Sequence, residues 1–531
     1  MTSLTGAKRL VRFVLRRDRA RLCVWIGVLT VLIVVSAASL RSLYPDQASI
    51  QQYVDLFGDN PALVAFAGPG YGFDDPNIGV VLVNETQVFG CIGMALMSIF
   101  LVNRHTRAEE DSERAELIRS TVVGRHAPGA AALVVIAAAN VVVGVLSTVG
   151  FVALGYATVG SIALGASFTA VGLVFAGITA VAAQIVSTGR ATIGTGAAAL
   201  IIAFTIRAVG DIGDNGLSWL SPIGWGQAVR AFADERWWTL GLCVVAALAL
   251  VVAAFWLATQ RDLGSGLIPQ RRGAAQAKRW MTTPIGLAFR LQRGALAAWI
   301  VGLFVIGVVY GSIGEDVDDL LEDNPGYADW FAQFEGASLT DSYFATAMAM
   351  LAVIAAGFSI SSTLQLRAEE STGRAESILA SAISRVRWAI AYLVIAVAGT
   401  VVIIAAAGAG VGVSYAVVVG DAGQIPRMIG ASLVTVPAVL VLVGVATLLF
   451  GLVPRWSLWA WLALALVGVV SFLGEVLRLP HWTRNISPLE HVPQLPAVDL
   501  EVTPLIVLTL LAAALIGVGL WAFRERDYDT A

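Results

Sequence analysis

Long apolar runs, separated by shorter polar stretches, are the dominant pattern along this chain of 531 residues. A helix that crosses a membrane needs about 20 mostly apolar residues, and runs of that length recur throughout the sequence. We therefore predict an all-α polytopic membrane protein with twelve transmembrane helices. The predicted spans are residues 22–40, 80–102, 129–153, 163–186, 191–209, 238–258, 294–312, 342–364, 388–413, 428–452, 456–474 and 503–523.

Composition supports a membrane protein and excludes other classes. Hydrophobic residues make up 57% of the chain and charged residues 13%, whereas a soluble domain has about 25% charged residues. The first apolar run is longer than the roughly 7–15 residues of a signal-peptide core, so we expect a retained span. With three isolated cysteines, four scattered histidines and no basic tail, the sequence predicts neither a metal site nor nucleic-acid binding.

A polar repeat divides the chain into two similar halves. The stretch from Arg107 to Ile118 returns as Arg367 to Ile378, and nine of twenty positions are identical between 107–126 and 367–386. Further matches pair Ser221-Pro222 with Ser487-Pro488 and Arg261-Asp262 with Arg526-Asp527. Since each half holds six predicted spans, the two repeats are expected to be parallel in the membrane. The predicted parts are a first repeat over 1–262, a linker over 263–283 and a second repeat over 284–531.

Basic residues gather in alternate loops and so predict an orientation. Seven Lys or Arg residues precede the first span, and five arginines lie between the second and third spans. Loops rich in Lys and Arg stay on the cytoplasmic side of a membrane. We therefore expect a multi-pass protein of the cytoplasmic membrane, with both termini and both copies of the polar repeat in the cytoplasm.

The two polar repeats are candidate docking elements. Glu110 and Arg114 stand four residues apart, as do Glu370 and Arg374, and this spacing supports a helix. Leu117 gives such a helix an apolar edge. A solvated turn that only enforces topology is the alternative, but retention of the pattern in both copies favours docking. The first copy is the more highly charged, because Asp111, Glu113 and Arg119 become Ser371, Gly373 and Leu379.

These residues carry a resemblance to a known family. The Arg-x-Glu-Glu…Arg-x-Glu stretch after the second span of each half, together with Ser221-Pro-Ile-Gly-Trp225, is similar to the permease subunits of ABC-type exporters. The similarity is to the fused, twelve-span actinobacterial branch described as polyketide-antibiotic (tetronasin-like) or multidrug exporters. It implies that the repeated stretches are coupling helices, which contact an ATP-binding subunit. The implied coupling residues are Arg107, Glu109, Glu110, Arg114, Glu116, Arg367, Glu369, Glu370, Arg374 and Glu376.

The chain itself has no phosphate-binding loop. Such a loop needs a lysine followed by Ser or Thr, but the two lysines, Lys8 and Lys278, are each followed by arginine. We therefore expect no cofactor in this chain and no ATPase activity of its own. By the resemblance, ATP and Mg are bound by two copies of a separate ABC ATP-binding subunit.

Polar, aromatic and methionine residues inside the spans are candidates for a substrate path. A polar group is costly in hydrocarbon, and methionine adapts to varied apolar ligands. Packing, or snorkelling to the interface, is the alternative for each residue, and we expect Arg207 and Asp211 to form a structural pair. Phe204 and Phe472 are included because the resemblance implies that the fifth span lines the path. The candidates are Asn84, Glu85, Phe89, Met94, Met97, Phe204, Tyr343, Phe344, Met348, Phe472 and Glu475.

Four further segments have predicted roles outside the spans. Residues 7–19 place Leu10, Phe13 and Val14 on one face beside many cations, as in a helix that lies on the membrane surface. Residues 284–293 are a weaker example, and a simple basic anchor is the alternative for both. The polar segments 211–236 and 478–502 are expected either to fold back as caps over the exit or to anchor at the membrane interface through Trp219, Trp225 and Trp482.

Together these features predict the permease subunit of an ATP-driven exporter. The predicted cargo is hydrophobic or amphipathic, such as a drug, antibiotic or secreted natural product, and efflux of this kind gives antibiotic resistance. An ion-coupled secondary transporter is the main alternative, although it needs a carboxylate relay near the midplane, where this chain places none. A membrane-embedded lipid-modifying enzyme is a second alternative, but the sequence offers no convergent catalytic residues.

Overall fold

The computed structural model describes most of the chain and is helical throughout the described part. Twelve of its helices are long and apolar enough to cross a membrane, which confirms the predicted all-α polytopic class and all twelve spans. The residues described are 3–58, 61–112, 114–262, 264–268, 276, 278–312, 314, 338–381, 383–473 and 481–526.

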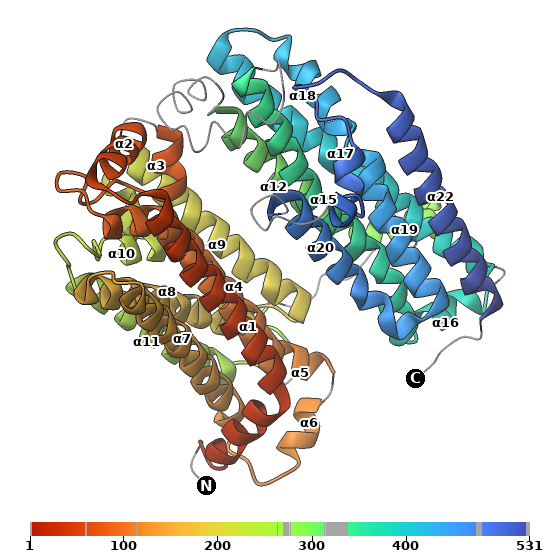
Figure 1. Cartoon of the computed structure of the whole chain (residues 1–531). Helices are drawn as coiled ribbons and strands as arrows, with labels where there is room; N and C mark the ends of the chain where they lie inside the picture. Colours follow the sequence, from red (N-terminus) through yellow and green to blue (C-terminus); the bar gives the residue numbers. More distant parts are fainter. Residues whose placement is uncertain are drawn as a thin grey trace. The chain divides into compact units, whose positions relative to one another are not determined.

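Contacts divide the chain into two compact units, Met1–Gly273 (unit 1) and Ala274–Ala531 (unit 2). In unit 1, α8 packs against α4, α7 and α11, while α1 packs against α7 and α4 (Figure 1). The helices of unit 1 are α1 (Ala7–Leu43), α2 (Gln47–Gly58), α3 (Pro61–Ala67), α4 (Ile78–His105), α5 (Arg107–Asp111), α6 (Arg114–Arg119), α7 (Ala127–Ala153), α8 (Thr158–Ile185), α9 (Gly189–Ile212), α10 (Pro222–Gln227) and α11 (Trp238–Thr259).

Unit 2 is organised around α17 and α19. The first packs against α12, α15 and α18, and the second packs against α22 and α15. The α19–α22 contact is close, because a Cβ added at Gly519 would lie 2.7 Å from the backbone of Thr447. The helices of unit 2 are α12 (Pro284–Ser312), α15 (Leu339–Ser371), α16 (Arg374–Leu379), α17 (Arg385–Val419), α18 (Gln424–Leu433), α19 (Val436–Leu452), α20 (Ala460–Leu473), α21 (His481–Arg484) and α22 (Val502–Glu525).

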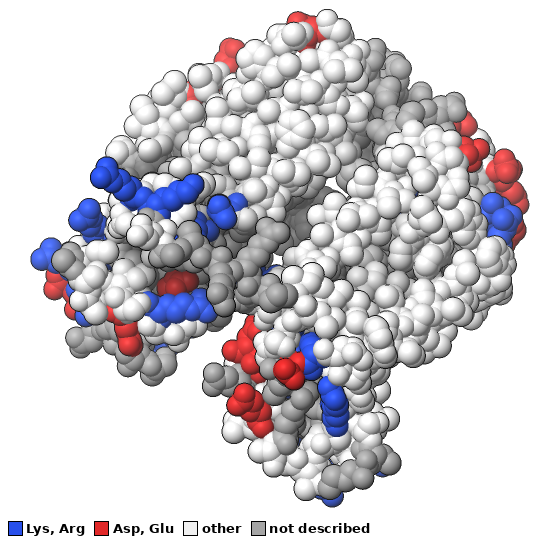
Figure 2. All heavy atoms as spheres, turned by 180° about the vertical axis from the view of Figure 1, so that it is seen from behind, with Lys and Arg blue, Asp and Glu red and all other residues white. Residues whose placement is uncertain are grey.

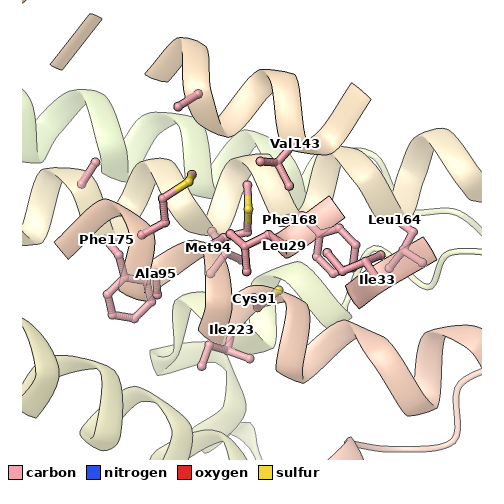
Figure 3. Close-up of a cluster of buried hydrophobic side chains, with 14 of the residues drawn as sticks. Leu29, Ile33, Cys91, Met94, Ala95, Val143, Leu164, Phe168, Phe175 and Ile223 are labelled. Atoms are coloured by element: carbon pink, nitrogen blue, oxygen red, sulfur yellow. The ribbon is translucent and has the colours of Figure 1, made fainter. Parts of the chain in front are cut away.

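The core of unit 1 joins side chains from seven helices, α1, α4 and α7 to α11. Leu29 of α1, Met94 of α4, Phe168 of α8 and Ile223 of the short helix α10 lie together and are buried (Figure 3). Lipid tails are as apolar as these side chains, so close van der Waals packing and interhelical hydrogen bonds hold the bundle together. One such bond joins α7 to α4, where Asn140 Nδ2 donates to Ser98 Oγ over 3.0 Å.

Helix α1 is longer than its predicted span because it includes the predicted surface segment. Its 37 residues exceed the membrane thickness, and the backbone leaves helical geometry at Asp18, with φ −107° and ψ 16°. Figure 1 shows the resulting bend near the N-terminal end. Before the bend, Val14 is buried against the protein, whereas Phe13 is 47% exposed, so the two residues differ in their surroundings.

Charged and apolar side chains are distributed as expected for a membrane protein. Charges lie near the ends of the long helices, and wide uncharged surfaces separate them (Figure 2). Many large apolar side chains are exposed on those surfaces, among them Val245 of α11 and Leu510 of α22. Such exposure is costly in water and suits contact with lipid tails.

Candidate functional site: the charged loops after the second span of each unit

The first charged loop, residues 104–126, is held by a buried ionic cluster around Glu110. Arg261, which follows α11, donates two hydrogen bonds to the Glu110 carboxylate, over 2.6 and 2.8 Å. Arg107 donates a third over 2.6 Å. Both guanidinium groups are almost fully buried. Glu110 therefore pairs with two charges that cannot reach water, and it fastens α5 to the end of α11.

Arg107 also ties the loop to two backbone segments. Its guanidinium donates to the carbonyl of Val186, just after α8, and to the carbonyl of Ser265 over 2.9 Å. Arg261 adds a bond to Gln184 Oε1 of α8 over 2.7 Å. The start of the loop is therefore locked to the ends of α8 and α11, the fourth and sixth spans of unit 1.

The second charged loop, residues 364–386, contains the equivalent pair. Arg526, which follows α22, donates to Glu370 Oε2 over 2.6 Å. The Arg526 guanidinium also stacks on Phe450 and Phe523, with its carbon 5.0 and 5.1 Å from the two ring centroids. Arg367 turns away from this pair and donates to Ser457 Oγ over 2.9 Å.

An equivalent ion pair thus occurs in both units. In each, the second glutamate of the repeated stretch binds the arginine that follows the sixth span. Arg261 and Arg526 were already visible in the sequence as matching positions of the repeat, but nothing there indicated that they bind Glu110 and Glu370. The only indication in the sequence was that an arginine follows the sixth apolar run of each half.

The predicted continuous helix through each loop is wrong. In the first loop α5 ends at Asp111 and α6 begins at Arg114; in the second, α15 ends at Ser371 and α16 begins at Arg374. The backbone of Gly373 lies in the left-handed region, with φ 70°. Because a turn interrupts the helix, the glutamate and the arginine four residues later do not lie on one helix. Arg374 approaches Glu369 at 3.6 Å, while Glu370 is bound by Arg526.

A second cluster joins the first loop to the N-terminal part of α1. Arg17 binds Glu109 over 2.5 Å. The buried Asp18, at the bend of α1, binds Arg104 through two contacts of 2.8 Å and lies 2.8 Å from His105 Nε2. Sequence reasoning missed this cluster, although an acidic residue within a run of arginines was a signal for an internal partner.

Backbone bonds fix the other end of the same N-terminal segment. The amide of Gly124 donates to the Thr5 carbonyl over 2.9 Å, and the amide of His126 donates to the Ser3 carbonyl over 3.0 Å. The N-terminal segment is thus attached to both ends of the first charged loop.

Burial separates the predicted coupling residues into two groups. Arg107, Glu109, Glu369 and Glu370 are between 0 and 9% exposed and act inside the protein. The exposed positions are Glu116, Arg374 and Glu376, on α6 and α16. Leu117, the predicted apolar edge, is 73% exposed. The side chain of Arg114 lies outside the described residues.

The predicted path residues of α4 differ in accessibility. Tyr53 of α2 donates its hydroxyl toward Asn84 Oδ1 at 2.8 Å and Glu85 Oε1 at 3.0 Å, so this polar pair is bound at the end of the span. Phe89 is 51% exposed, whereas Met94 and Met97 are fully buried in the core of unit 1.

Other predicted path residues also pack within their own unit. Phe344 and Met348 are buried, and Tyr343 donates to the Tyr310 carbonyl over 3.0 Å. Phe204 is partly buried and lies edge-on to Phe66, with centroids 6.2 Å apart. The side chain of Phe472 and all of Glu475 lie outside the described residues.

The predicted pair of Arg207 and Asp211 is confirmed. The two groups are 3.4 Å apart, and Arg207 is fully buried. Arg207 also donates to the carbonyl of Ala65, at α3, over 2.8 Å. Arg207 therefore attaches α3 to α9 while Asp211 balances its charge, which is a structural role.

The first predicted cap folds back onto the bundle. Within 211–236, Ile223 and Val229 are fully buried, and Gln87 of α4 donates to the Gly226 carbonyl over 2.9 Å. At the surface of this segment, the hydrogen bond from Arg236 lowers the pKa of Asp234.

No group of three or more potential metal ligands occurs among the residues that the structure describes.

Comparison with known proteins covers nearly the whole chain. A family model described as "Multidrug efflux system permease Rv1217c, C-terminal domain" matches residues 281–524, which include the second charged loop. Over 529 residues the chain is 39% identical to the multidrug efflux system permease protein Rv1217c of Mycobacterium tuberculosis (strain ATCC 25618 / H37Rv). This alignment covers 99% of the chain and 96% of that protein, so both charged loops lie within it.

Proposed function

Since the chain belongs to the family of the multidrug efflux system permease Rv1217c, we propose that it is the membrane subunit of an ATP-driven exporter. Two copies of a separate ABC ATP-binding subunit supply ATP hydrolysis and hold the nucleotide and Mg. The cargo is a hydrophobic or amphipathic compound, such as a drug or natural product. The polyketide-antibiotic cargo suggested by the sequence remains a narrower prediction.

The observation that carries this proposal is the matching attachment of the two charged loops. Each loop begins at the end of the second span and is bound to the end of the sixth span through a buried Glu–Arg pair, Glu110–Arg261 or Glu370–Arg526. A buried pair with good hydrogen-bond geometry holds its partners in one arrangement. A push on either loop is therefore passed to two spans of the same unit at once.

The exposed residues of the two loops support a docking site for each ATP-binding subunit. The short helices α6 and α16 carry the exposed residues of the loops, with Glu116 and Glu376 at equivalent positions of the repeat. Leu117 adds an exposed apolar side chain to α6. We assign the docking contact to these two helices, and we assign the buried glutamates to holding the loops in place.

Sidedness follows from the same assignment. ATP is available in the cytoplasm, so both loops and both termini face that side. Arginine-rich segments next to the spans agree with this orientation. Within unit 1, the accessible side chains of Phe89 and Phe204 are the predicted residues left to contact cargo, while the buried methionines shape the bundle.

Co-purification tests the docking assignment. Glu116→Arg together with Glu376→Arg should abolish capture of the ATP-binding subunit and the ATPase activity that drug stimulates. These side chains are exposed, so the fold should be retained. Glu501→Arg is the matched control, because Glu501 is exposed at the end of α22 that lies away from the charged loop. It should leave both the capture and the ATPase activity unchanged.

Two results contradict the proposal. Undiminished capture after the double reversal would place docking elsewhere. Drug transport that continues when the partner's Walker lysine is changed, and that follows an imposed proton gradient, would favour an ion-coupled secondary transporter.

A further inference from the structure

We propose that an exposed strip of cations on the N-terminal segment of α1 binds the headgroups of anionic phospholipids. This surface goes beyond the proposed docking of ATP-binding subunits, because it faces away from the charged loop. The strip, called the N-terminal cationic strip below, consists of Lys8, Arg9, Arg12, Arg16 and Arg19.

The side chains of the five cations are exposed. Within the part of the chain that the structure describes, none of these side chains forms a hydrogen bond or an ion pair. Their neighbours Arg17 and Asp18, in contrast, are bound to Glu109 and Arg104. The segment thus has one face whose charges are neutralised inside the protein and another whose charges need an external anion.

Apolar side chains flank the strip. At 100° per residue, the four cations before the bend (Lys8, Arg9, Arg12 and Arg16) fall within about one third of the helix circumference. Leu15 lies next to one edge of the strip and Phe13 next to the other, and they are 43% and 47% exposed. The opposite face packs on the core of unit 1 through Val14. Cations bordered by exposed Phe and Leu are typical of helices that lie at the boundary between headgroups and acyl chains.

The bend of α1 sets the strip at the height of the headgroups. At 1.5 Å per residue, the part of α1 from Leu22 to Leu43 is long enough to cross a hydrocarbon layer of about 30 Å. The residues before Leu22 therefore lie outside that layer, directly beside it. Headgroups are the anions present at this depth, which favours lipid over an acidic protein surface.

The segment is attached at both ends to the first charged loop. Asp18 is bound by Arg104 at one end, and Thr5 accepts the amide of Gly124 at the other. Lipid binding at the strip therefore restrains the loop as well. Each cation near an anionic surface strengthens binding roughly fivefold, so five cations form a substantial anchor.

Hydrogen exchange of the full-length protein tests the proposal without a transport assay. The protein is reconstituted in nanodiscs of phosphatidylcholine alone or of phosphatidylcholine mixed with phosphatidylglycerol. Amides of residues 7–17 should exchange at least tenfold more slowly in the mixed lipid. High salt should remove this difference, because it screens charge.

Two matched variants distinguish the strip from net charge. K8Q/R9Q/R12Q/R16Q should lose the protection that phosphatidylglycerol confers. K278Q/R279Q/R290Q/R293Q removes four exposed cations that precede the first span of unit 2 and should retain it. Equal loss in the two variants would overturn the proposal, as would protection that appears only when an ATP-binding subunit is added. Wild-type protection that is the same in both lipids, or insensitive to salt, would also overturn it and needs no variant.

Discussion

Glu110→Gln is expected to destabilise unit 1 more than the equivalent Glu370→Gln destabilises unit 2. The two glutamates occupy the same position of the repeat but neutralise different numbers of cations. Glu110 accepts from Arg107, which is fully buried, and from Arg261, whose side chain is 7% exposed. Glu370 accepts from Arg526 alone, which is 15% exposed and stacked on two aromatic rings.

The magnitudes follow from these partners. Removing one member of a buried ion pair costs about 3–5 kcal/mol, since a charge is left without a partner, and Glu110→Gln leaves two such charges. A lost hydrogen bond to a charged group costs about 1.5–3 kcal/mol, which suits Arg526 because its guanidinium remains stacked on two aromatic rings. At about 2 °C per kcal/mol for a unit of this size, Glu110→Gln should lower the midpoint by ~6–10 °C and Glu370→Gln by ~3–6 °C.

The assay is thermal unfolding of detergent-solubilised protein, followed by the fraction that remains monodisperse. Glu525→Gln is the matched control, because its 3.8 Å pair with Arg524 is exposed and such pairs contribute about 1 kcal/mol or less. In Glu110→Gln/Arg261→Gln one orphaned charge is removed, so this variant should be more stable than the sum of its single changes. Equal losses at Glu110 and Glu370, or a Glu110 loss no larger than the control, would refute the assignment of the buried cluster.

Two further predictions use the same assay. Gly519→Val should destabilise unit 2 by about 1–3 kcal/mol, because the added side chain meets the backbone of α19. Gly517→Val is the control, since the space around its Cβ is open, and it should not destabilise the unit. Equal losses in the two variants would contradict the close α19–α22 contact. Tyr53→Phe removes the hydroxyl that reaches Asn84 and Glu85 and should cost about 1–3 kcal/mol, whereas an unchanged midpoint would show that this contact contributes nothing to stability.

The spans were predictable because each is a local property of the sequence. About 20 consecutive apolar residues suffice to identify a transmembrane helix, whichever neighbours it packs against. All twelve spans appear in the structure, and some of the helices extend beyond the apolar run into polar residues. Helix α1, for example, begins at Ala7. The pair of Arg207 and Asp211 was predictable for the same reason, since a separation of four along one helix brings side chains together.

The partners of the charged loops were not predictable from such patterns. Glu110 and Arg261 are 151 residues apart, and Glu370 and Arg526 are 156 apart. Helical spacing relates near neighbours only, so it suggested Arg114 and Arg374 in their place. The buried state of Met94 was hidden for a related reason, because an almost uniformly apolar span does not indicate which of its faces meets other helices.

The first loop is more highly charged than the second, and the structure shows that some of its acidic residues bind other helices of unit 1. The first loop has more charged residues, but Asp111 accepts the amide of Gly189 at the start of α9 over 2.7 Å, and Glu109 binds Arg17 of α1. In the second loop, Glu369 binds Gln365 and Arg374, which belong to the loop and the helix before it. Of the additional charged residues of the first loop, Asp111 therefore serves attachment to α9. Under the proposed mechanism, a push on α6 moves α1 and α9 as well as α4 and α11, whereas a push on α16 acts on α15, on α22 and, through the bond from Arg367 to Ser457, on the segment before α20. The two units then respond differently to similar docking contacts.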